Sequence, residues 1–299
     1  MSRLKNKEKS EQQALKEWLV NNYINIACNL FRYKGLEAFG ENLTSQIFEK
    51  MLIFDGKACG FKDDKLGLLI LPCGGLSRLN VYGIPQDFIC VGYNGQTFKR
   101  NVNNSVLIKN NGTYSPDYPM IDYYCGRIAD CEMAKKININ ANKMPFALSG
   151  DPDQLLTMKN MVEQVTNNKV ALYMPKKVRS ASADPVEVKV INTGAEFIAD
   201  KINDSQQDYI STLLTFLGLD NVSVEKRERL NTIEAGANNE HIKSNLYLKL
   251  QCREEACKQL NEMFGTNLSV SINYDYIEDF IGAQEEQDNA IKEEDTNNE

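Results

Sequence analysis

A chain of 299 residues with a hydrophobic share of 42% can bury one large core or two to three small ones. No run approaches the roughly 18 consecutive apolar residues that a membrane-spanning helix requires, so we expect a soluble intracellular protein. The net charge of −7 argues against a protein that grips nucleic acid through a broad basic surface, because phosphate neutralisation needs Lys and Arg.

The two ends of the chain carry charges of opposite sign. The first ten residues contain four basic side chains, Arg3, Lys5, Lys7 and Lys9, against one glutamate. Residues 284–299 contain seven acidic side chains against one lysine. Polar ends of this composition are typical of mobile tails.

The eight cysteines are expected to be reduced and mostly buried. No apolar segment behind the basic start could act as a signal peptide, which argues against a disulfide framework. The sequence has no C-x-x-C pair and one histidine, His241, so we expect no metal site. It also lacks a phosphate-binding G-x-x-x-x-G-K-[ST] loop, a G-x-S-x-G motif and a dinucleotide fingerprint. We therefore expect no catalytic residues, no cofactor and no enzymatic activity.

Residues 15–30 predict an amphipathic helix. Its apolar stripe recurs at steps of three and four residues and consists of Leu15, Trp18, Leu19, Tyr23, Ile26 and Leu30. This position favours Trp18 as a core anchor over a binding residue. A second, short helix is predicted over residues 43–51.

Residues 52–112 show short apolar runs broken by repeated glycines. The runs at 68–71, 88–91 and 106–108 have the length and composition of strands. Asn94-Gly95 predicts a two-residue hairpin turn in which both residues have positive φ. We therefore predict a small barrel, and a structural one, because no basic and aromatic face is evident.

The next region predicts a helix followed by a compact helix and hairpin. The first helix covers residues 121–139 and should end before Pro145. A helix is then predicted over 151–165, with strands over 169–174 and 186–191. The exposed connection between the strands carries three basic residues, Lys176, Lys177 and Arg179.

A helix predicted over residues 196–217 is apolar at both ends, whereas residues 203–208 are all polar. Two interpretations stay open. The helix either spans two domains beside a water-filled channel or is a partly exposed surface helix. Gly218 can close it in the left-handed conformation.

The segment after Gly218 is charged and has no apolar period, which predicts a loop. Its candidate functional residues are Glu225, Lys226, Arg227, Glu228, Arg229, Asn231, Glu234 and Asn238. A second helix is predicted to resume near Glu240 and to end at Gly265, before a strand over residues 268–274.

Six short strings occur in order across this part of the chain. They are D-K-I-N from residue 200, T-F-L-G from 215, E-K-R-E-R from 225, N-N-E-x-I from 238, R-E-E-A-C from 253 and L-N-E-x-F-G from 260. At these spacings the strings resemble the connector of small short-tailed bacteriophages with protein-primed genomes, also called the upper collar or portal protein. The rest of the chain agrees with that family in length and order of elements.

The resemblance implies an α+β portal fold with a helical stem, an SH3-like β-barrel in the wing and a small α/β clip, in a subunit that forms rings. The implied regions are an N-terminal tail and wing helices (1–51), the barrel (52–113), a stem helix (114–143), the clip (144–194), a second stem helix (195–219), a channel loop (220–238), a wing helix and strand (239–275) and an acidic C-terminal tail (276–299).

The resemblance also implies a dodecameric ring at one capsid vertex, through which double-stranded DNA is packaged and ejected without sequence specificity. The loop residues and Lys201 would lie on the channel wall, and Lys176, Lys177 and Arg179 would contact the motor or tail. The implied partners are capsid and scaffolding proteins, a packaging ATPase and a lower collar or tail protein, with no membrane partner. The ring would be assembled in the host cytoplasm and reside at the head-tail junction of the virion.

The basic amino end of this family binds a packaging RNA in at least one lineage, which makes Arg3, Lys5, Lys7 and Lys9 candidate RNA contacts. These residues are interspersed rather than clustered, so a simple tail stays an alternative. Two other functions also stay open: a capsid or tail adaptor without a channel, and a monomeric barrel protein that binds nucleic acid non-specifically. A ring with an axial hole wide enough for duplex DNA would separate the three.

Overall fold

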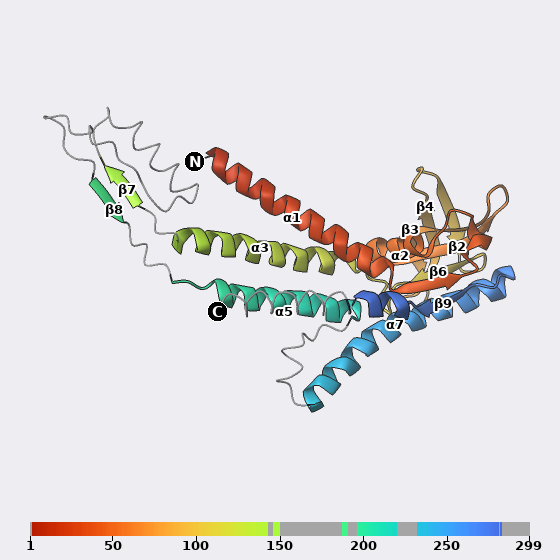
Figure 1. Cartoon of the computed structure of the whole chain (residues 1–299). Helices are drawn as coiled ribbons and strands as arrows, with labels where there is room; N and C mark the ends of the chain where they lie inside the picture. The colour runs from red at the N-terminus through yellow and green to blue at the C-terminus, as the bar shows by residue number, and fades with distance from the viewer. Residues whose placement is uncertain are drawn as a thin grey trace. The chain divides into compact units, whose positions relative to one another are not determined.

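The computed structural model describes residues 2–142, 146–149, 187–190, 196–219, 232–280 and 282. The chain forms two compact units (Figure 1). The large unit contains residues 1–130 and 206–299, and the small unit contains residues 131–205. In the described ranges, no helix combines the length and apolar character needed to cross a membrane.

Two helices begin the large unit and confirm the predicted ones. α1 (Ser2–Cys28) buries an apolar face that includes Tyr23. α2 (Ser45–Asp55) begins after Thr44, whose side-chain oxygen accepts a hydrogen bond from the Ile47 N–H at 3.3 Å. This cap satisfies one of the backbone donors that a helix start leaves open.

Trp18 is not the predicted core anchor, because 63% of its surface is exposed. Residues on an α-helix advance by about 100° each, which puts Trp18 on the side of α1 opposite to the buried Val20, Tyr23 and Ala27. The predicted stripe was wide enough to include Trp18 at its edge. The actual buried face is rotated away from it.

The basic N-terminal residues are also not a separate tail, because α1 begins at Ser2 and includes them. The first strand after α1, β1 (Phe31–Lys34), pairs antiparallel with β9 (Ser269–Ile272), the predicted C-terminal strand. A 3-10 turn, η1 (Leu36–Phe39), follows β1. Residues 274–280 are helical, and their apolar side chains pack against the main core, so the structure contradicts a tail that starts at residue 276.

Five strands form a curled antiparallel half-barrel, which confirms the predicted all-β region. They are β2 (Lys57–Asp63), β3 (Gly67–Leu79), β4 (Pro85–Val91), β5 (Thr97–Asn101) and β6 (Ser105–Lys109), in the spatial order β5-β4-β3-β2-β6. A register shift between Cys73 and Leu76 in β3 bends the sheet. The small core inside consists of Cys59, Phe61, Cys73, Phe88 and Cys90. Several cysteines are thus buried thiols, as predicted.

The β4-β5 hairpin lies where Asn94-Gly95 predicted one, but its turn differs. Only Gly95 has positive φ, at 82°. The Gly95 N–H donates to Gly92 O at 2.8 Å, and the Gly92 N–H donates to Gln96 O at 2.8 Å. This geometry is a three-residue loop in which the last residue is left-handed. Asn94 therefore keeps an ordinary backbone conformation.

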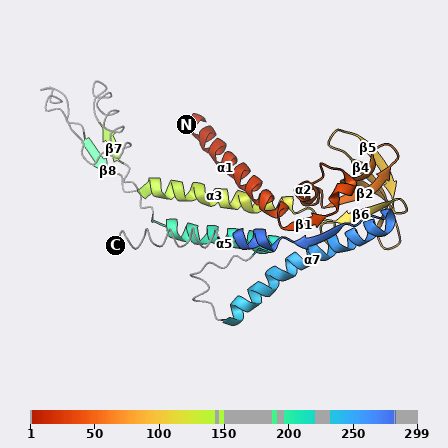
Figure 2. The same ribbon diagram turned by 45° about the vertical axis from the view of Figure 1, so that its right-hand side comes forward.

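α7 (Thr232–Phe264) lies along the half-barrel next to β6 in both views (Figures 1 and 2). It ends at Gly265, as predicted, where φ is 69°. Its buried positions recur at the spacing of one helix face and include Leu246, Ala256, Cys257 and Leu260. α7 and α2 with the sheet therefore enclose the main core of the large unit.

α3 (Tyr118–Asn142) and α5 (Ala199–Leu217) are the two predicted long helices. Their parts in the large unit bury an apolar face: Ile121, Cys125 and Ile128 from α3, and Leu213, Leu214 and Leu217 from α5. The polar middle of α5 is exposed as predicted, except at Gln206, which is 7% exposed.

In the small unit, Asn138 of α3 holds the start of α5. Its Nδ2 donates to Glu196 O at 2.9 Å, and its Oδ1 accepts from the Ile198 N–H at 3.1 Å. β7 (Phe146–Ser149) pairs antiparallel with β8 (Glu187–Val190). β8 confirms the strand predicted over 186–191, and β7 was not predicted. The helix predicted over 151–165 and the strand over 169–174 lie outside the described residues.

Candidate channel segment and its anchor

The C-terminal end of α5 is closed by Gly218, as the sequence predicted. Gly218 has φ of 92°. Its N–H donates to Leu214 O at 2.9 Å, and the Leu219 N–H donates to the same oxygen at 2.9 Å. Leu219 is fully buried. A left-handed glycine followed by a buried apolar residue fixes the direction in which the chain leaves the helix.

α7 contacts α5 at this same point. Asn245 Nδ2 donates to Thr215 O at 3.0 Å. Gly218 lies so close to Leu246 that an added Cβ would come within 2.8 Å of the Leu246 Cβ. The chain therefore leaves the core at Leu219 and re-enters it at Asn245, at one place.

The segment between these two residues has two parts. Residues 220–231 lie outside the described residues, whereas Thr232 to Asn245 is the first part of α7. At 1.5 Å per residue this helical part is about 20 Å long. We call residues 232–244 the helical arm, and residues 220–231 the channel segment.

The arm corrects the predicted loop, which was expected to continue to residue 238 with the helix resuming near Glu240. Glu234 and Asn238 lie on α7 instead. An apolar period detects a helix that packs on a core, but a helix can also form without one. Glu and Ala in this stretch are good helix formers, and a single Gly236 costs only about 1 kcal/mol relative to Ala.

The other predicted site residues fall into three groups. Lys201 lies on α5, with its Nζ 3.6 Å from Glu196 Oε1 and with both side chains at least 75% exposed, which makes it a solvated pair. Arg3, Lys5, Lys7 and Lys9 lie on the first turns of α1. The remaining predicted residues lie outside the described residues: Glu225, Lys226, Arg227, Glu228, Arg229, Asn231, Lys176, Lys177 and Arg179.

Arg253, which the sequence analysis placed in a family string without a role, forms a buried ion pair with Glu49 of α2. Arg253 Nε donates to Glu49 Oε1 at 2.8 Å, and Nη2 donates to Oε2 at 2.6 Å. Both side chains are 1% exposed. Burial opposes the charged form of Arg253, but Glu49 more than offsets this and raises the Arg253 pKa above its ordinary value.

The remaining donors and acceptors of this pair are also satisfied. Arg253 Nη1 donates to Asn110 O at 3.1 Å and to Lys249 O at 2.9 Å. Tyr33 donates its hydroxyl to Glu49 Oε1 at 2.6 Å, and burial together with this carboxylate raises the Tyr33 pKa. A buried bidentate pair with its other hydrogen bonds made fixes the elements that carry it.

A second buried pair lies one helical turn earlier on α7. Lys249 Nζ is 2.8 Å from Asp117 Oδ2, with side chains 10% and 5% exposed, and it lies 4.8 Å from the centre of the Phe216 ring. Together the two pairs tie α7 to α2, to the start of α3 and to the end of α5. We call Glu49, Arg253, Asp117 and Lys249 the ionic anchor of the arm.

Sequence reasoning missed the ionic anchor because charged residues are normally read as solvent-facing. One signal was present. Lys249 and Arg253 are four residues apart and lie on the same face of α7 as the apolar Leu246, Ala256 and Leu260. Charges inside an apolar stripe indicate buried pairing.

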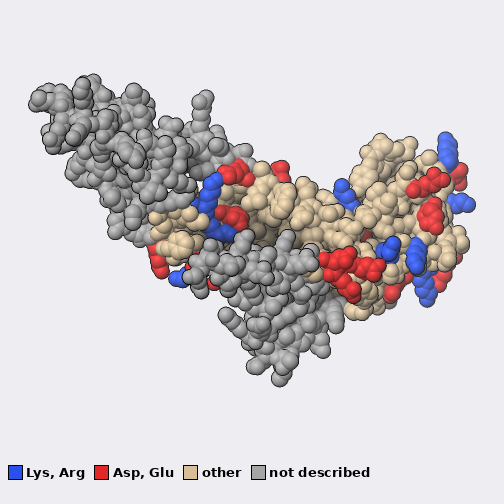
Figure 3. Space-filling view, viewed as in Figure 1, with Lys and Arg blue, Asp and Glu red and all other residues tan. Residues whose placement is uncertain are grey.

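The described surface carries mixed charges rather than a basic face. On the side shown in Figure 3, Lys and Arg alternate with Asp and Glu over the half-barrel. Independently of that view, Arg78 forms an ion pair with Asp87, and Arg32 forms an exposed one with Asp275. Such a surface has little affinity for the phosphate backbone.

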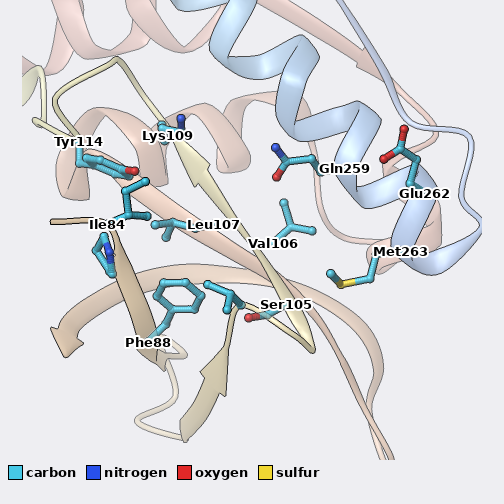
Figure 4. A pocket seen from close by; sticks show the side chains of 12 residues that line it. Ile84, Phe88, Ser105, Val106, Leu107, Lys109, Tyr114, Gln259, Glu262 and Met263 are labelled. Atoms are coloured by element: carbon cyan, nitrogen blue, oxygen red, sulfur yellow. The ribbon is translucent and has the colours of Figure 1, made fainter. Parts of the chain in front are cut away.

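A groove of about 490 Å³ lies between the half-barrel and the end of α7 (Figure 4). Phe88 of β4 and Val106 of β6 line its apolar side, and Gln259, Glu262 and Met263 of α7 line the other. The lining suits contact with another protein surface better than it suits a small charged ligand. Among the described residues no cluster of His, Cys, Asp or Glu could hold a metal ion.

The sequence matches the phage connector family (Phage Connector, GP10) over residues 3–277. The fold is similar, at low sequence identity, to two solved phage portal structures and to a structure from a gene transfer agent particle. The portal and tail of native bacteriophage P68 gives 16% identity, 90% coverage of this chain, 89% of that chain and a TM-score of 0.46. A HK97 family phage portal protein from Corynebacterium diphtheriae is 10% identical, with 88% of this chain and 94% of that chain covered and a TM-score of 0.43. The virion of a native gene transfer agent particle is 9% identical, with 91% of this chain and 84% of that chain covered and a TM-score of 0.48.

Connector proteins of phages are the class to which the family match assigns this chain. The family match covers nearly the whole chain, and the chain therefore belongs to the phage connector family. Its role is that of a portal or head-tail connector, and the family is a structural one.

Proposed function

We propose that this connector forms a closed dodecameric ring at one capsid vertex and that double-stranded DNA passes through the ring during packaging and ejection. The observation that carries the proposal is the family match over residues 3–277. A closed ring requires a heterologous interface, with two different surfaces of each copy in contact. A permanent interface of this kind buries about 2,000 Å² or more.

The channel segment and the arm would face the bore of the ring. This proposal is supported by the close contact of Gly218 with Leu246, because the chain leaves the core just after Gly218 and returns to it just before Leu246. The segment carries Lys226, Arg227 and Arg229 against Glu225 and Glu228. Each phosphate that a lysine or arginine neutralises strengthens binding and its salt dependence, so this balance favours a wall along which DNA slides. Lys201 would lie on the same wall.

The ring would serve as a platform without catalysing nucleotide hydrolysis itself. A packaging ATPase would supply the motor, and Lys176, Lys177 and Arg179 would contact it or the lower collar or tail protein. Capsid and scaffolding proteins would contact the ring in the particle, which would place it in the virion at the head-tail junction after assembly in the host cytoplasm.

The N-terminal basic residues would be the site for a packaging RNA, if this lineage uses one. Arg3, Lys5, Lys7 and Lys9 lie on one short stretch of α1. A gel-shift at about 0.15 M salt with structured RNA, comparing the full chain with one that lacks residues 1–10, tests this role. Equal RNA binding by both proteins would exclude an RNA-binding role of these four residues.

Deleting residues 222–242 tests the channel role. This change removes the channel segment and most of the arm together, and the chain can close because Leu219 and Asn245 already lie at one place. We expect rings of unchanged copy number, and particles that lose packaged DNA. The matched control replaces residues 222–231 by a Gly-Ser sequence of equal length, which keeps the arm and should retain more DNA. Failure of the deletion variant to form rings would make the segment structural and contradict the proposal.

A further inference from the structure

Trp18 of α1 is an exposed aromatic side chain that does not pack in the core of its own chain. It is the only tryptophan in the chain, and it is 63% exposed. Its nearest neighbours on the same side of α1, Ala14 and Asn22, are exposed and uncharged, and the exposed Glu11 lies two turns before it. Tryptophan carries a large apolar surface and is enriched among the residues that dominate protein interfaces. An exposed tryptophan beside small or uncharged side chains therefore suits a contact with another chain.

A recess of about 420 Å³ lies on the other side of α1, between α1, the end of α2 and the start of α3. Phe54 and Tyr118 form an aromatic pair in it, with ring centres 4.9 Å apart and planes at 22°. Glu17 and Asp122 also line it. One oxygen of each carboxylate accepts from the same chain, from Gln13 Nε2 at 2.9 Å and from Lys16 Nζ at 2.8 Å, and the second oxygen of each can accept from another donor. An indole ring needs an aromatic or apolar surface and an acceptor for its N–H, and the recess offers both.

Trp18 cannot fill the recess of its own chain. The α1 residues in the recess are Gln13, Lys16, Glu17, Val20, Asn21 and Ile24. At about 100° per residue, Gln13, Lys16, Val20 and Ile24 lie roughly 120–160° around the helix from Trp18, whereas Glu17 and Asn21 lie roughly 100° and 60° from it, at the near edge of the recess. The centre of the recess thus faces away from Trp18, as the two different surfaces of a head-to-tail contact do.

Trp18 and the recess also lie at the same height on α1. Three of the six lining residues of α1 precede position 18 and three follow it. A cyclic operator rotates copies without shifting them along the ring axis. The contact proposed below therefore requires α1 to run roughly along the ring axis, which would bring Trp18 of one copy level with the recess of the next.

We propose that Trp18 of each copy inserts into the recess between α1, α2 and α3 of the neighbouring copy. The inference rests on the proposed ring and adds the residues that hold adjacent copies together. The apolar groove in Figure 4 is lined by the half-barrel and the end of α7 and does not share α1 with Trp18, so it lacks the common height that favours this recess. One tryptophan buries about 150–250 Å², which makes Trp18 an anchor within a larger interface.

The fluorescence of Trp18 reports this contact directly, since the full chain has no other tryptophan. Comparing assembled with dissociated protein, we expect a blue-shifted emission maximum and weaker quenching by acrylamide in the ring. Trp18→Ala should raise the concentration at which half of the rings dissociate by at least about thirty-fold, as loss of an interface hot spot does. The matched control is Tyr82→Ala, which removes another aromatic side chain, 84% exposed, and should leave that concentration unchanged.

Phe54→Ala should weaken assembly as Trp18→Ala does, and the double variant should be little worse than either single one, because both remove one contact. The thermal midpoint of dissociated Trp18→Ala should equal that of the unmodified chain, which excludes misfolding. Rings that keep an accessible Trp18 and tolerate Trp18→Ala would overturn the contact and leave the ring proposal standing. Absence of rings from the unmodified chain would overturn the proposed ring itself, and the contact with it.

Discussion

The two parts of α7 differ in their sequence pattern, although they belong to one helix. From Leu246 onward, a buried residue recurs every three or four positions, and two of these residues are the charged Lys249 and Arg253. In residues 232–244 the sequence has no comparable apolar period. The helix therefore has an anchored part and an arm. The anchored turns hold α7 to the rest of the large unit through buried side chains, and the proposed channel role belongs to the other turns of the same helix.

The largest expected effect comes from breaking the ionic anchor. Arg253→Ala leaves Glu49 buried without its partner, and removal of one member of a buried pair costs about 3–5 kcal/mol. We expect the thermal midpoint of the purified chain to fall by roughly 10 °C. The control is Lys258→Ala, which removes an exposed pair with Glu262 on the same helix and should change the midpoint little. An equal fall of the thermal midpoint in both variants would contradict a larger contribution of the buried pair to stability.

The next effect concerns the base of the arm. Gly218→Ala must adopt a left-handed φ of 92° and place its Cβ within 2.8 Å of Leu246, so we expect a loss of about 1–3 kcal/mol. Gly83 also has positive φ, at 75°, but an added Cβ would meet no atom within 4 Å. In denaturant unfolding, Gly83→Ala should thus lose only the free energy that the left-handed backbone costs, without a further loss from a steric clash. A loss no greater at Gly218 would mean that α5 and α7 are not in close contact there.

A smaller effect should appear at alkaline pH, in the core that the anchored part of α7 covers. Burial, with nearby acidic groups, raises the pKa of Cys28 and of Cys257 from 9.0 to about 12. Between these values the unfolded chain releases protons that the folded chain keeps, so the free energy of unfolding should decrease as pH rises from 9 to 12. Cys28→Ala should reduce this slope by about one proton. An unchanged slope would show that Cys28 does not titrate with folding.

The smallest effect is expected at Lys201. Its pair with Glu196 is solvated, and such pairs contribute about 0–1 kcal/mol. Lys201→Ala should leave the midpoint of thermal unfolding unchanged within about 1 °C while altering the passage of DNA in packaging assays. Loss of stability without a change in packaging would assign Lys201 a structural role.

Local chemistry made much of the fold predictable. Gly218 and Gly265 mark helix ends through left-handed backbone, and the alternating residues of β9 mark a strand. Trp18 was misplaced because the width of an apolar stripe does not fix which edge faces the core. The arm was missed because it forms a helix without an apolar period, and the anchor because buried charges depend on partners such as Glu49 that are distant in sequence.

Electron cryo-microscopy of the purified full chain at neutral pH would show whether the protein forms the proposed ring. We expect closed rings of twelve copies with an axial bore wide enough for duplex DNA, and with residues 220–244 of every copy directed toward that bore. Particles that are only monomers or dimers, or rings in which those residues lie in a dry interface, would contradict the proposal.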